Sequence, residues 1–265
     1  YGLRGIAYYE LRLFGPRQDL HSGTFGGGVT NPANALVAML AALKDEHGRV
    51  QVPGFYDDVL PLTDAERRQY AELPFDDDQF AAQIGVEAVS GEHGYTTLER
   101  RWARPTCDIN GLTSGYQSEG AKTVLPARAS AKFSFRLVPN QDPAKLSAAL
   151  REFFASRLPA GIRMELIDYH GAPGVVVPLE SPYIAAAAAA IEAGFGRRPV
   201  FVREGGSIPI VNTFTRELGT DVLLLGWGQN DDNTHSPNEK FSLADYHCGT
   251  RASAYLWSEL AKLPA

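Results

Sequence analysis

A histidine among acidic residues near the end of the chain has the composition of a metal-binding loop. Residues 231–239 read DDNTHSPNE, with His235 at the centre. They follow an apolar run at residues 222–225, and ligands of open α/β sheets bind in loops after the carboxyl ends of strands. A neutral imidazole suits zinc or manganese, and a neighbouring carboxylate could orient it. No second ligand at metal-binding spacing stands beside His235, so the pattern alone does not define a metal site.

Two further positions could bind an anion. Residues 204–209, EGGSIP, join a predicted strand to a predicted helix, and their glycines leave backbone N–H groups free at a helix N-terminus. That arrangement suits a substrate carboxylate, although Ser207 could instead serve as an ordinary N-cap. Arg136 lies within an otherwise apolar, alternating strand and therefore needs a carboxylate partner. An internal salt bridge would satisfy Arg136 as well as a substrate would, and it is the commoner arrangement.

A glycine-rich loop near the start of the chain contains a third candidate. Residues 15–28 include the motif DLHSG, with His21 at its centre. Glycines allow the backbone and a polar side chain to approach a ligand closely, and functional residues gather in such loops. The spacing fits equally well a plain connection from strand to helix in which His21 caps a turn.

The elements that must position these residues follow from the hydrophobic pattern. Alternation with period two predicts a strand at residues 4–14, and Asn31 and Asp142, each followed by proline, predict two helix starts. We expect strands at residues 4–14, 106–111, 129–138 and 162–169, and helices at residues 32–46 and 143–158. Residues 50–103 are set aside as a helical insertion, with helices at 63–72 and 76–84. The remaining β-α-β-β-α-β order predicts a ferredoxin-like domain at residues 1–172.

Residues 173–265 have a different pattern. Helices are predicted at residues 181–193, 208–218 and 243–263, and apolar strands at residues 199–202 and 222–225. Alternating helices and fully apolar strands indicate a buried, largely parallel sheet, so the fold class is α/β overall. Two strands are too few for such a sheet, and this second domain therefore reads as part of a larger one. We expect its uncovered apolar surface to promote self-association.

Composition limits the partners. A net charge of −6 and a pI near 5.6 argue against a nucleic-acid partner, and no apolar run is long enough for a membrane span. Cys107 and Cys248 lie far apart and fit reduced thiols in a cytoplasmic protein. The chain begins at Tyr1 with a strand-like sequence and no methionine, from which we expect a fragment of a longer protein.

Six motifs that occur in order along the chain resemble one family. They are YGLRG from Tyr1, DLHSG from Asp19, GAKTVLP from Gly120, RLVP from Arg136, REGGSIP from Arg203 and HSPNE from His235. Together they resemble the dizinc peptidases that include carnosine dipeptidases, aminoacylases and bacterial carboxypeptidase G, with the cytosolic nonspecific dipeptidases as the nearest branch. The resemblance covers essentially the whole chain.

The resemblance implies a catalytic α/β domain with two divalent metals, zinc or manganese, interrupted by a ferredoxin-like lid that forms a homodimer. It implies that His235 ligates one metal. It also implies that His21 reaches into the partner's active site to stabilise the oxyanion of the tetrahedral intermediate, where Thr123 also contacts the substrate in trans. Arg136, His170 and Ser207 would hold the terminal carboxylate of a small peptide substrate.

The family's other metal ligands, a His, two Asp and a Glu, and its general-base Glu would precede Tyr1. We therefore expect the full-length protein to cleave dipeptides or short peptides with a metal-bridged hydroxide, and this chain alone to be inactive. Two alternatives stay open at this point. The chain could be a non-catalytic dimerisation module or pseudoenzyme, or the protein could be an aminoacylase that acts on N-acyl amino acids. By resemblance, the insertion at residues 50–103 favours the dipeptidase branch.

Overall fold

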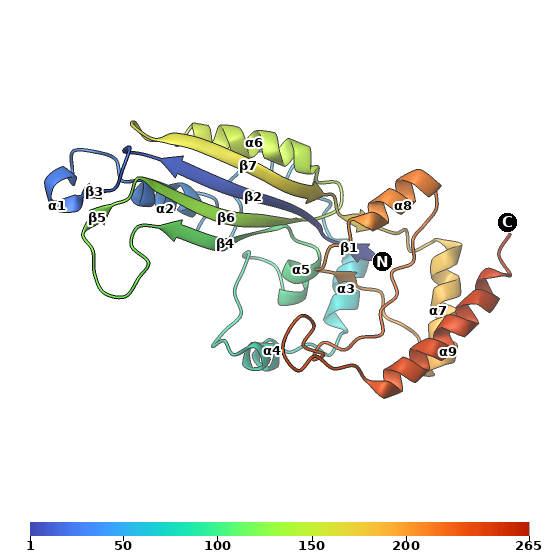
Figure 1. Cartoon of the computed structure of the whole chain (residues 1–265). Coiled ribbons are helices and arrows are strands. Elements are labelled where there is room, and N and C mark those ends of the chain that lie inside the picture. The colour runs from blue at the N-terminus through green and yellow to red at the C-terminus, as the bar shows by residue number, and fades with distance from the viewer. Residues whose placement is uncertain (265) are drawn as a thin grey trace. The chain divides into compact units, whose positions relative to one another are not determined.

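The strand β2, Gly5–Phe14, lies inside a four-stranded antiparallel sheet of order β4-β6-β2-β7 in the computed structural model, which describes residues 1–264. The other strands are β4 (Thr106–Ser114), β6 (Arg128–Leu137) and β7 (Arg163–Ala172). Helices α2 (Pro32–Ala41) and α6 (Pro143–Ala155) pack against the sheet (Figure 1). The predicted β-α-β-β-α-β order of a ferredoxin-like fold is confirmed.

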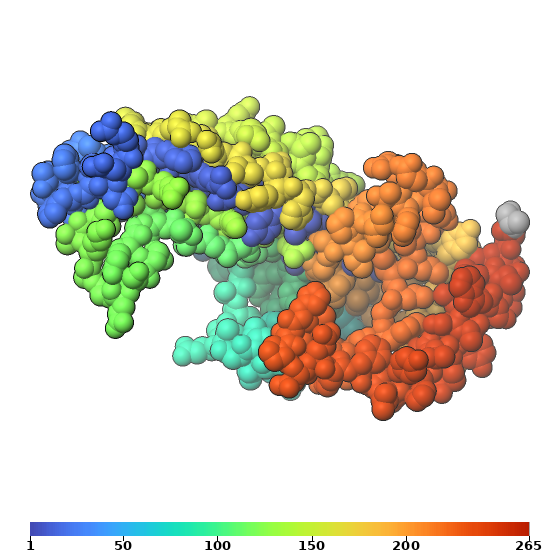
Figure 2. Space-filling model, viewed as in Figure 1, coloured from blue at the N-terminus to red at the C-terminus, as the bar shows by residue number. Residues whose placement is uncertain are grey.

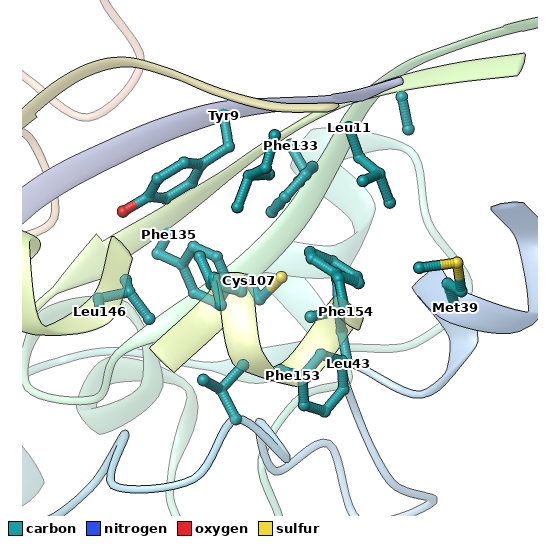
Figure 3. Packing of buried hydrophobic residues seen from close by; sticks show 14 of the residues in the cluster. Tyr9, Leu11, Met39, Leu43, Cys107, Phe133, Phe135, Leu146, Phe153 and Phe154 are labelled. Carbon is teal, nitrogen blue, oxygen red and sulfur yellow. The ribbon is translucent and has the colours of Figure 1, made fainter. Parts of the chain in front are cut away.

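The period-two pattern of β2 directs one set of side chains into the core. Figure 3 shows Tyr9 and Leu11 of β2 beside Phe133 and Phe135 of β6. The Tyr9 and Phe133 rings stack at 5.7 Å between centroids, and both side chains are fully buried. Leu146, Leu150, Phe153 and Phe154 of α6 and Leu36 and Met39 of α2 belong to the same cluster. The opposite face of the sheet is therefore left to Ile6, Tyr8, Glu10 and Arg12.

Side-chain caps start both covering helices, as the sequence predicts. Asn31 Oδ1 accepts the N–H of Ala33 at 2.8 Å, and Asp142 Oδ1 accepts the N–H of Ala144 at 2.8 Å. The prediction that the first helix continues to residue 46 is wrong, because α2 ends at Ala41. Asp45 Oδ1 accepts two backbone N–H groups, from residues 47 and 49, and this turn competes with further helix.

Three short helices form the insertion, which lies between α2 and β4 in the sequence. They are α3 (Asp64–Ala71), α4 (Asp77–Ile84) and α5 (Thr97–Trp102), and the first two match the prediction. The third was not predicted, although its capping box was readable: Thr96 and Glu99 cap each other's backbone N–H groups. A buried ion pair follows, in which Arg104 donates to both carboxylate oxygens of Glu92 at 2.6 Å.

The described chain divides into two units. The sheet unit contains Leu3–Val175 and Glu204–Pro209, and the helical unit contains Tyr1–Gly2, Val176–Arg203 and the chain from Ile210 onwards. The division into domains at residues 1–172 and 173–265 stays a prediction. Among the helices of residues 1–264, none has the length and apolar character that a membrane span requires.

Two helices pack closely in the helical unit. They are α7 (Pro182–Phe195) and α9 (Leu243–Leu260), and α8 (Ile210–Leu218) is the third long helix of the unit. A Cβ atom at Gly194 would lie 2.7 Å from the Cβ of Ala252, so the α7–α9 contact requires glycine there. All three helices were predicted.

The predicted apolar strands of the second domain are wrong. The short strand β9 is Arg203–Glu204, not residues 199–202, and it forms a sheet of order β8-β1-β9 with β8 (Val175–Val176) and β1 (Gly2–Leu3). Residues 222–225 join no sheet within the described chain. A strand needs a neighbour for its backbone N–H and C=O groups, and residues 222–225 have none among the described strands. Self-association through this unit stays a prediction.

We expect Phe133→Ala to lower the free energy of unfolding by about 3–5 kcal/mol, because it removes a fully buried ring and leaves a cavity. Urea denaturation followed by fluorescence measures the change. Ile84→Ala is the control, since Ile84 is 55% exposed and its truncation should cost about 0.5 kcal/mol or less. Equal losses from the two substitutions would contradict the assignment of the core.

Candidate functional site

Arg136 and Ser207 meet in the sheet unit. Arg136 Nη1 donates a hydrogen bond to Ser207 Oγ at 2.8 Å, across 71 residues of chain. Among residues 1–264, no carboxylate forms an ion pair with Arg136, so the alternative of an internal salt bridge is not observed. Ser207 is not a helix N-cap either, because α8 begins at Ile210. The guanidinium charge of Arg136 is thus bound to a neutral hydroxyl and can accept an anion.

His170 lies on the same face of the sheet as Arg136. In the register of the sheet, His170 on β7 pairs with Tyr8, and Arg136 on β6 pairs with Ile6. Ile6 and Tyr8 alternate with the buried Ala7 and therefore point to the face opposite the core. Arg136 and His170 lie on the two strands that flank β2, and their partners on β2 are two residues apart. This geometry separates their Cα atoms by roughly 12 Å. The two residues therefore share the sheet face that is turned away from the core.

A β-bulge and a ring contact fix the orientation of His170. The pairing with β7 shifts between Tyr8 and Tyr9, so that Tyr8 pairs with His170 and Tyr9 with Asp168. Tyr169 is the extra residue, and it keeps His170 opposite Tyr8. The imidazole stacks on the Tyr8 ring at 5.7 Å with an interplanar angle of 14°.

The bulge is anchored by a buried carboxylate. Tyr169 donates its hydroxyl hydrogen to Glu10, whose carboxylate also accepts from Arg12 at 2.8 Å. Glu10 is only 6% exposed. The hydrogen bond from Arg12, followed by that from Tyr169, holds the pKa of Glu10 below its usual value, so this carboxylate is charged and structural at neutral pH.

His21 and Thr123 lie side by side at the far end of the sheet unit. The short strand β3 (Leu20–His21) pairs with β5 (Val124–Leu125), and Ser22 N–H donates to the carbonyl of Thr123 at 3.1 Å. Figure 2 shows these segments, in blue and green, together at the surface. The structure therefore brings together two residues that lie 102 positions apart in sequence.

His21 does cap a turn, and the cap determines which nitrogen is free. Its Nδ1 accepts the N–H of Gly23 at 3.1 Å, at the start of the one-turn helix α1 (Ser22–Phe25). A neutral imidazole that accepts at Nδ1 carries its hydrogen at Nε2. The exposed edge of His21 is thus a hydrogen-bond donor. The two interpretations of this loop, a capping histidine and a ligand-binding one, are compatible.

These two groups of residues occupy opposite ends of the sheet. Arg136 pairs with Ile6 near the start of β2, whereas Arg128 pairs with Phe14 at its end, where the β3–β5 ribbon follows (Figure 1). Eight residues of strand span roughly 26 Å. Asp19 holds the ribbon at the far end by accepting the N–H of Ala127 at 2.8 Å. Within one chain, His21 cannot touch a ligand that is bound at Arg136.

His235 lies in a folded loop of the helical unit and has a positive φ of 64°, which is uncommon outside glycine. The neighbouring acids do not orient its imidazole, contrary to expectation. Lys240 Nζ donates to Asp231 at 2.9 Å and to Asp232 at 3.0 Å, and Asp232 also accepts the N–H of Gln229 at 2.7 Å. That N–H, and then Lys240, lower the pKa of Asp232. Both carboxylates therefore hold the loop together.

No complete metal site is present in the described part of the chain. Residues 1–264 contain no group of three or more His, Cys, Asp or Glu side chains placed to hold a metal ion. Zinc in proteins takes three or four protein ligands, so these residues do not fit a resident metal by themselves. A metal-ligating role for His235 stays a prediction.

The chain is similar to known dipeptidases and peptidase domains. Residues 1–162 match the model of the M20 peptidase dimerisation domain. The Cys-Gly metallodipeptidase DUG1 of Candida albicans is 38% identical over 256 residues, which are 95% of this chain and 52% of that protein. The human Beta-Ala-His dipeptidase is 33% identical over 99% of this chain and 52% of its own length.

A solved structure shares the fold. The dipeptidase Dug1p of Saccharomyces cerevisiae superposes with a TM-score of 0.86 at 34% identity, covering 100% of this chain and 56% of that one. The chain thus spans about half the length of the relatives that it matches. Given the match over residues 1–162 and the ferredoxin-like sheet, the chain belongs to the M20 peptidase dimerisation domain family.

Proposed function

We propose that the full-length protein is a metal-dependent dipeptidase and that this chain holds the carboxylate end of its substrate. The observation that carries the proposal is the contact of Arg136 with Ser207, on the sheet face that also presents His170. The names of the relatives, a Cys-Gly metallodipeptidase and a Beta-Ala-His dipeptidase, support the same class of substrate.

The geometry suits a carboxylate. The guanidinium of Arg136 can donate two parallel hydrogen bonds to the two carboxylate oxygens. The Ser207 hydroxyl, which accepts from Arg136, keeps its own hydrogen free to donate to the anion. The hydrogen bond to Ser207 restrains the guanidinium of Arg136, so less side-chain freedom remains to be lost when a carboxylate binds.

The remaining pair, His21 and Thr123, would act from a second copy of the chain. Within one chain these residues lie roughly 26 Å or more from Arg136, given the length of β2. In a homodimer, the Nε2–H of His21 could meet the substrate held by the partner and donate to the oxygen that becomes negative when the peptide carbonyl is attacked. We therefore propose a homodimer with shared sites. His235 would provide one ligand to a site with two divalent metals, zinc or manganese.

The isolated 265-residue chain should not hydrolyse dipeptides when zinc or manganese is added, because its described residues do not assemble a metal site. Release of free amino acids from a panel of dipeptides, measured by chromatography, tests this. The full-length protein under the same conditions is the positive control. Turnover by the isolated chain at the rate of the full-length protein would refute the proposed division of roles.

In the full-length protein, Arg136→Met should reduce kcat/KM for a dipeptide about 10- to 100-fold, since a hydrogen bond to a charged group is worth ~1.5–3 kcal/mol. The corresponding dipeptide amide, which lacks the carboxylate, should be hydrolysed equally by both proteins. Arg128→Met is the matched control on the same strand, eight positions away at an exposed site. An equal loss for dipeptide and amide would argue against carboxylate binding.

Mixed dimers test the action of His21 in trans. In their own homodimers, His21→Ala should lower kcat by about 10²-fold or more, as for a lost oxyanion donor, and Arg136→Met should show the loss of kcat/KM predicted above. In a heterodimer of the two variants, one site carries both defects and the other carries neither. Differently tagged, co-expressed heterodimers should then recover about half of the wild-type activity, as expected for two equivalent sites related by a two-fold axis. If His21 acted in cis, every site would be defective and no activity would return.

A further inference from the structure

Arg4 is fastened to the loop that carries Ser207. The backbone N–H of Arg4 donates to the carbonyl of Glu204 at 3.2 Å, and its Nε donates to the carbonyl of Gly205 at 3.1 Å. Its Nη1 donates to the carbonyl of Arg104 at 3.5 Å. These contacts all lie within the sheet unit. Arg4 therefore ties the residues just before Ser207 to the start of the central strand.

The loop is shaped around this guanidinium. A Cβ atom at Gly205 would lie 2.9 Å from Nη2 of Arg4 and 2.9 Å from the carbonyl oxygen of Arg101. The end of the Arg4 side chain can shift to relieve such a contact, but the backbone oxygen of Arg101 cannot, so the loop needs glycine at position 205 in order to keep its place. By contrast, a Cβ at Gly206 would meet nothing within 4 Å.

Arg4 also adds positive charge close to Arg136. Its side chain donates hydrogen bonds to neutral carbonyls, and among residues 1–264 it forms no ion pair. Burial, followed by repulsion from Arg136, lowers the pKa of Arg4 to about 10, against opposing attraction from Asp108 and Glu204. Arg4 thus remains charged at neutral pH, and it lies close enough to Arg136 for the two charges to repel. An arriving carboxylate relieves that repulsion.

We propose that Arg4 is a positioning residue for carboxylate recognition, which acts by holding residues 204–206 so that the Ser207 hydroxyl stays on Arg136. This inference rests on the proposed dipeptidase function. Arg4 does not touch the substrate. Its loss releases the Ser207 loop from the sheet, and the carboxylate site loses its preformed geometry and part of its positive potential.

The test compares Arg4→Gln and Arg4→Lys with wild type in the full-length protein, on a dipeptide and on its C-terminal amide. Arg4→Gln should raise KM for the dipeptide about tenfold and leave kcat within about twofold, the pattern expected when binding that is equal in the ground state and the transition state is lost. The amide should be hydrolysed as by wild type. The KM of Arg4→Lys for the dipeptide should lie between those of wild type and Arg4→Gln, because an ammonium keeps the charge but cannot reproduce the planar guanidinium. Arg163→Gln is the matched control, an exposed arginine at the other end of the sheet.

Gly205→Ala gives a second test that leaves Arg4 in place. Its Cβ would clash with the carbonyl oxygen of Arg101 and displace the loop from its place beside Arg4, which should give the same selective rise in KM for the dipeptide. If both Arg4→Gln and Gly205→Ala leave the preference for dipeptide over amide unchanged, or reduce both activities equally, the positioning role is refuted. If wild type itself shows no such preference, the proposed function fails first. If Arg136→Met abolishes the preference and the Arg4 and Gly205 variants keep it, this inference alone fails.

Discussion

The register of β2 between β6 and β7 determines where every candidate residue of the sheet unit lies. Tyr9 pairs with Phe133 in the core, and two positions along the same strands Ala7 pairs with Phe135, both fully buried. With that register fixed by packing, Arg136 must face away from the core. A slip of one residue would turn Arg136 inward and a core phenylalanine outward, at a cost that aromatic packing makes prohibitive. The hydrophobic core thus sets the geometry of a polar site on the opposite face.

The length of the same strands separates the two halves of the proposed site. Ten residues of β2 place the Arg136–Ser207 pair at one end of the sheet and the His21–Thr123 ribbon at the other. A rigid, hydrogen-bonded sheet cannot fold back on itself to close that distance. If both groups act on one substrate, a second chain must supply one of them. Dimerisation, which the family match indicates, would then be a requirement of the chemistry and not only a source of stability.

Local patterns predicted the sheet, but not the contacts that build the site. Period-two alternation and the caps at Asn31 and Asp142 act over a few residues and were readable. The apolar run at residues 222–225 gave a wrong strand, because composition does not show whether a partner strand exists. The partner of Arg136 stayed open because Ser207 lies 71 residues away. The sequence places Arg4 in the YGLRG motif but does not predict its contacts, because its three backbone partners lie about 100 to 200 residues away.

A site that grips a terminal carboxylate restricts the reaction by geometry. Binding of the carboxylate fixes one end of the substrate. The bond that reaches the attacking group is then the one next to the terminal residue. Internal peptide bonds of a long chain are therefore not cleaved. An N-acyl amino acid presents the same carboxylate, so the Arg136–Ser207 contact cannot distinguish it from a dipeptide. Whether the enzyme prefers a dipeptide or an N-acyl amino acid must then depend on groups that contact the substrate on the other side of the scissile bond. A free amino terminus carries a positive charge and an acyl group does not, so those groups need an acceptor in the first case and an apolar surface in the second.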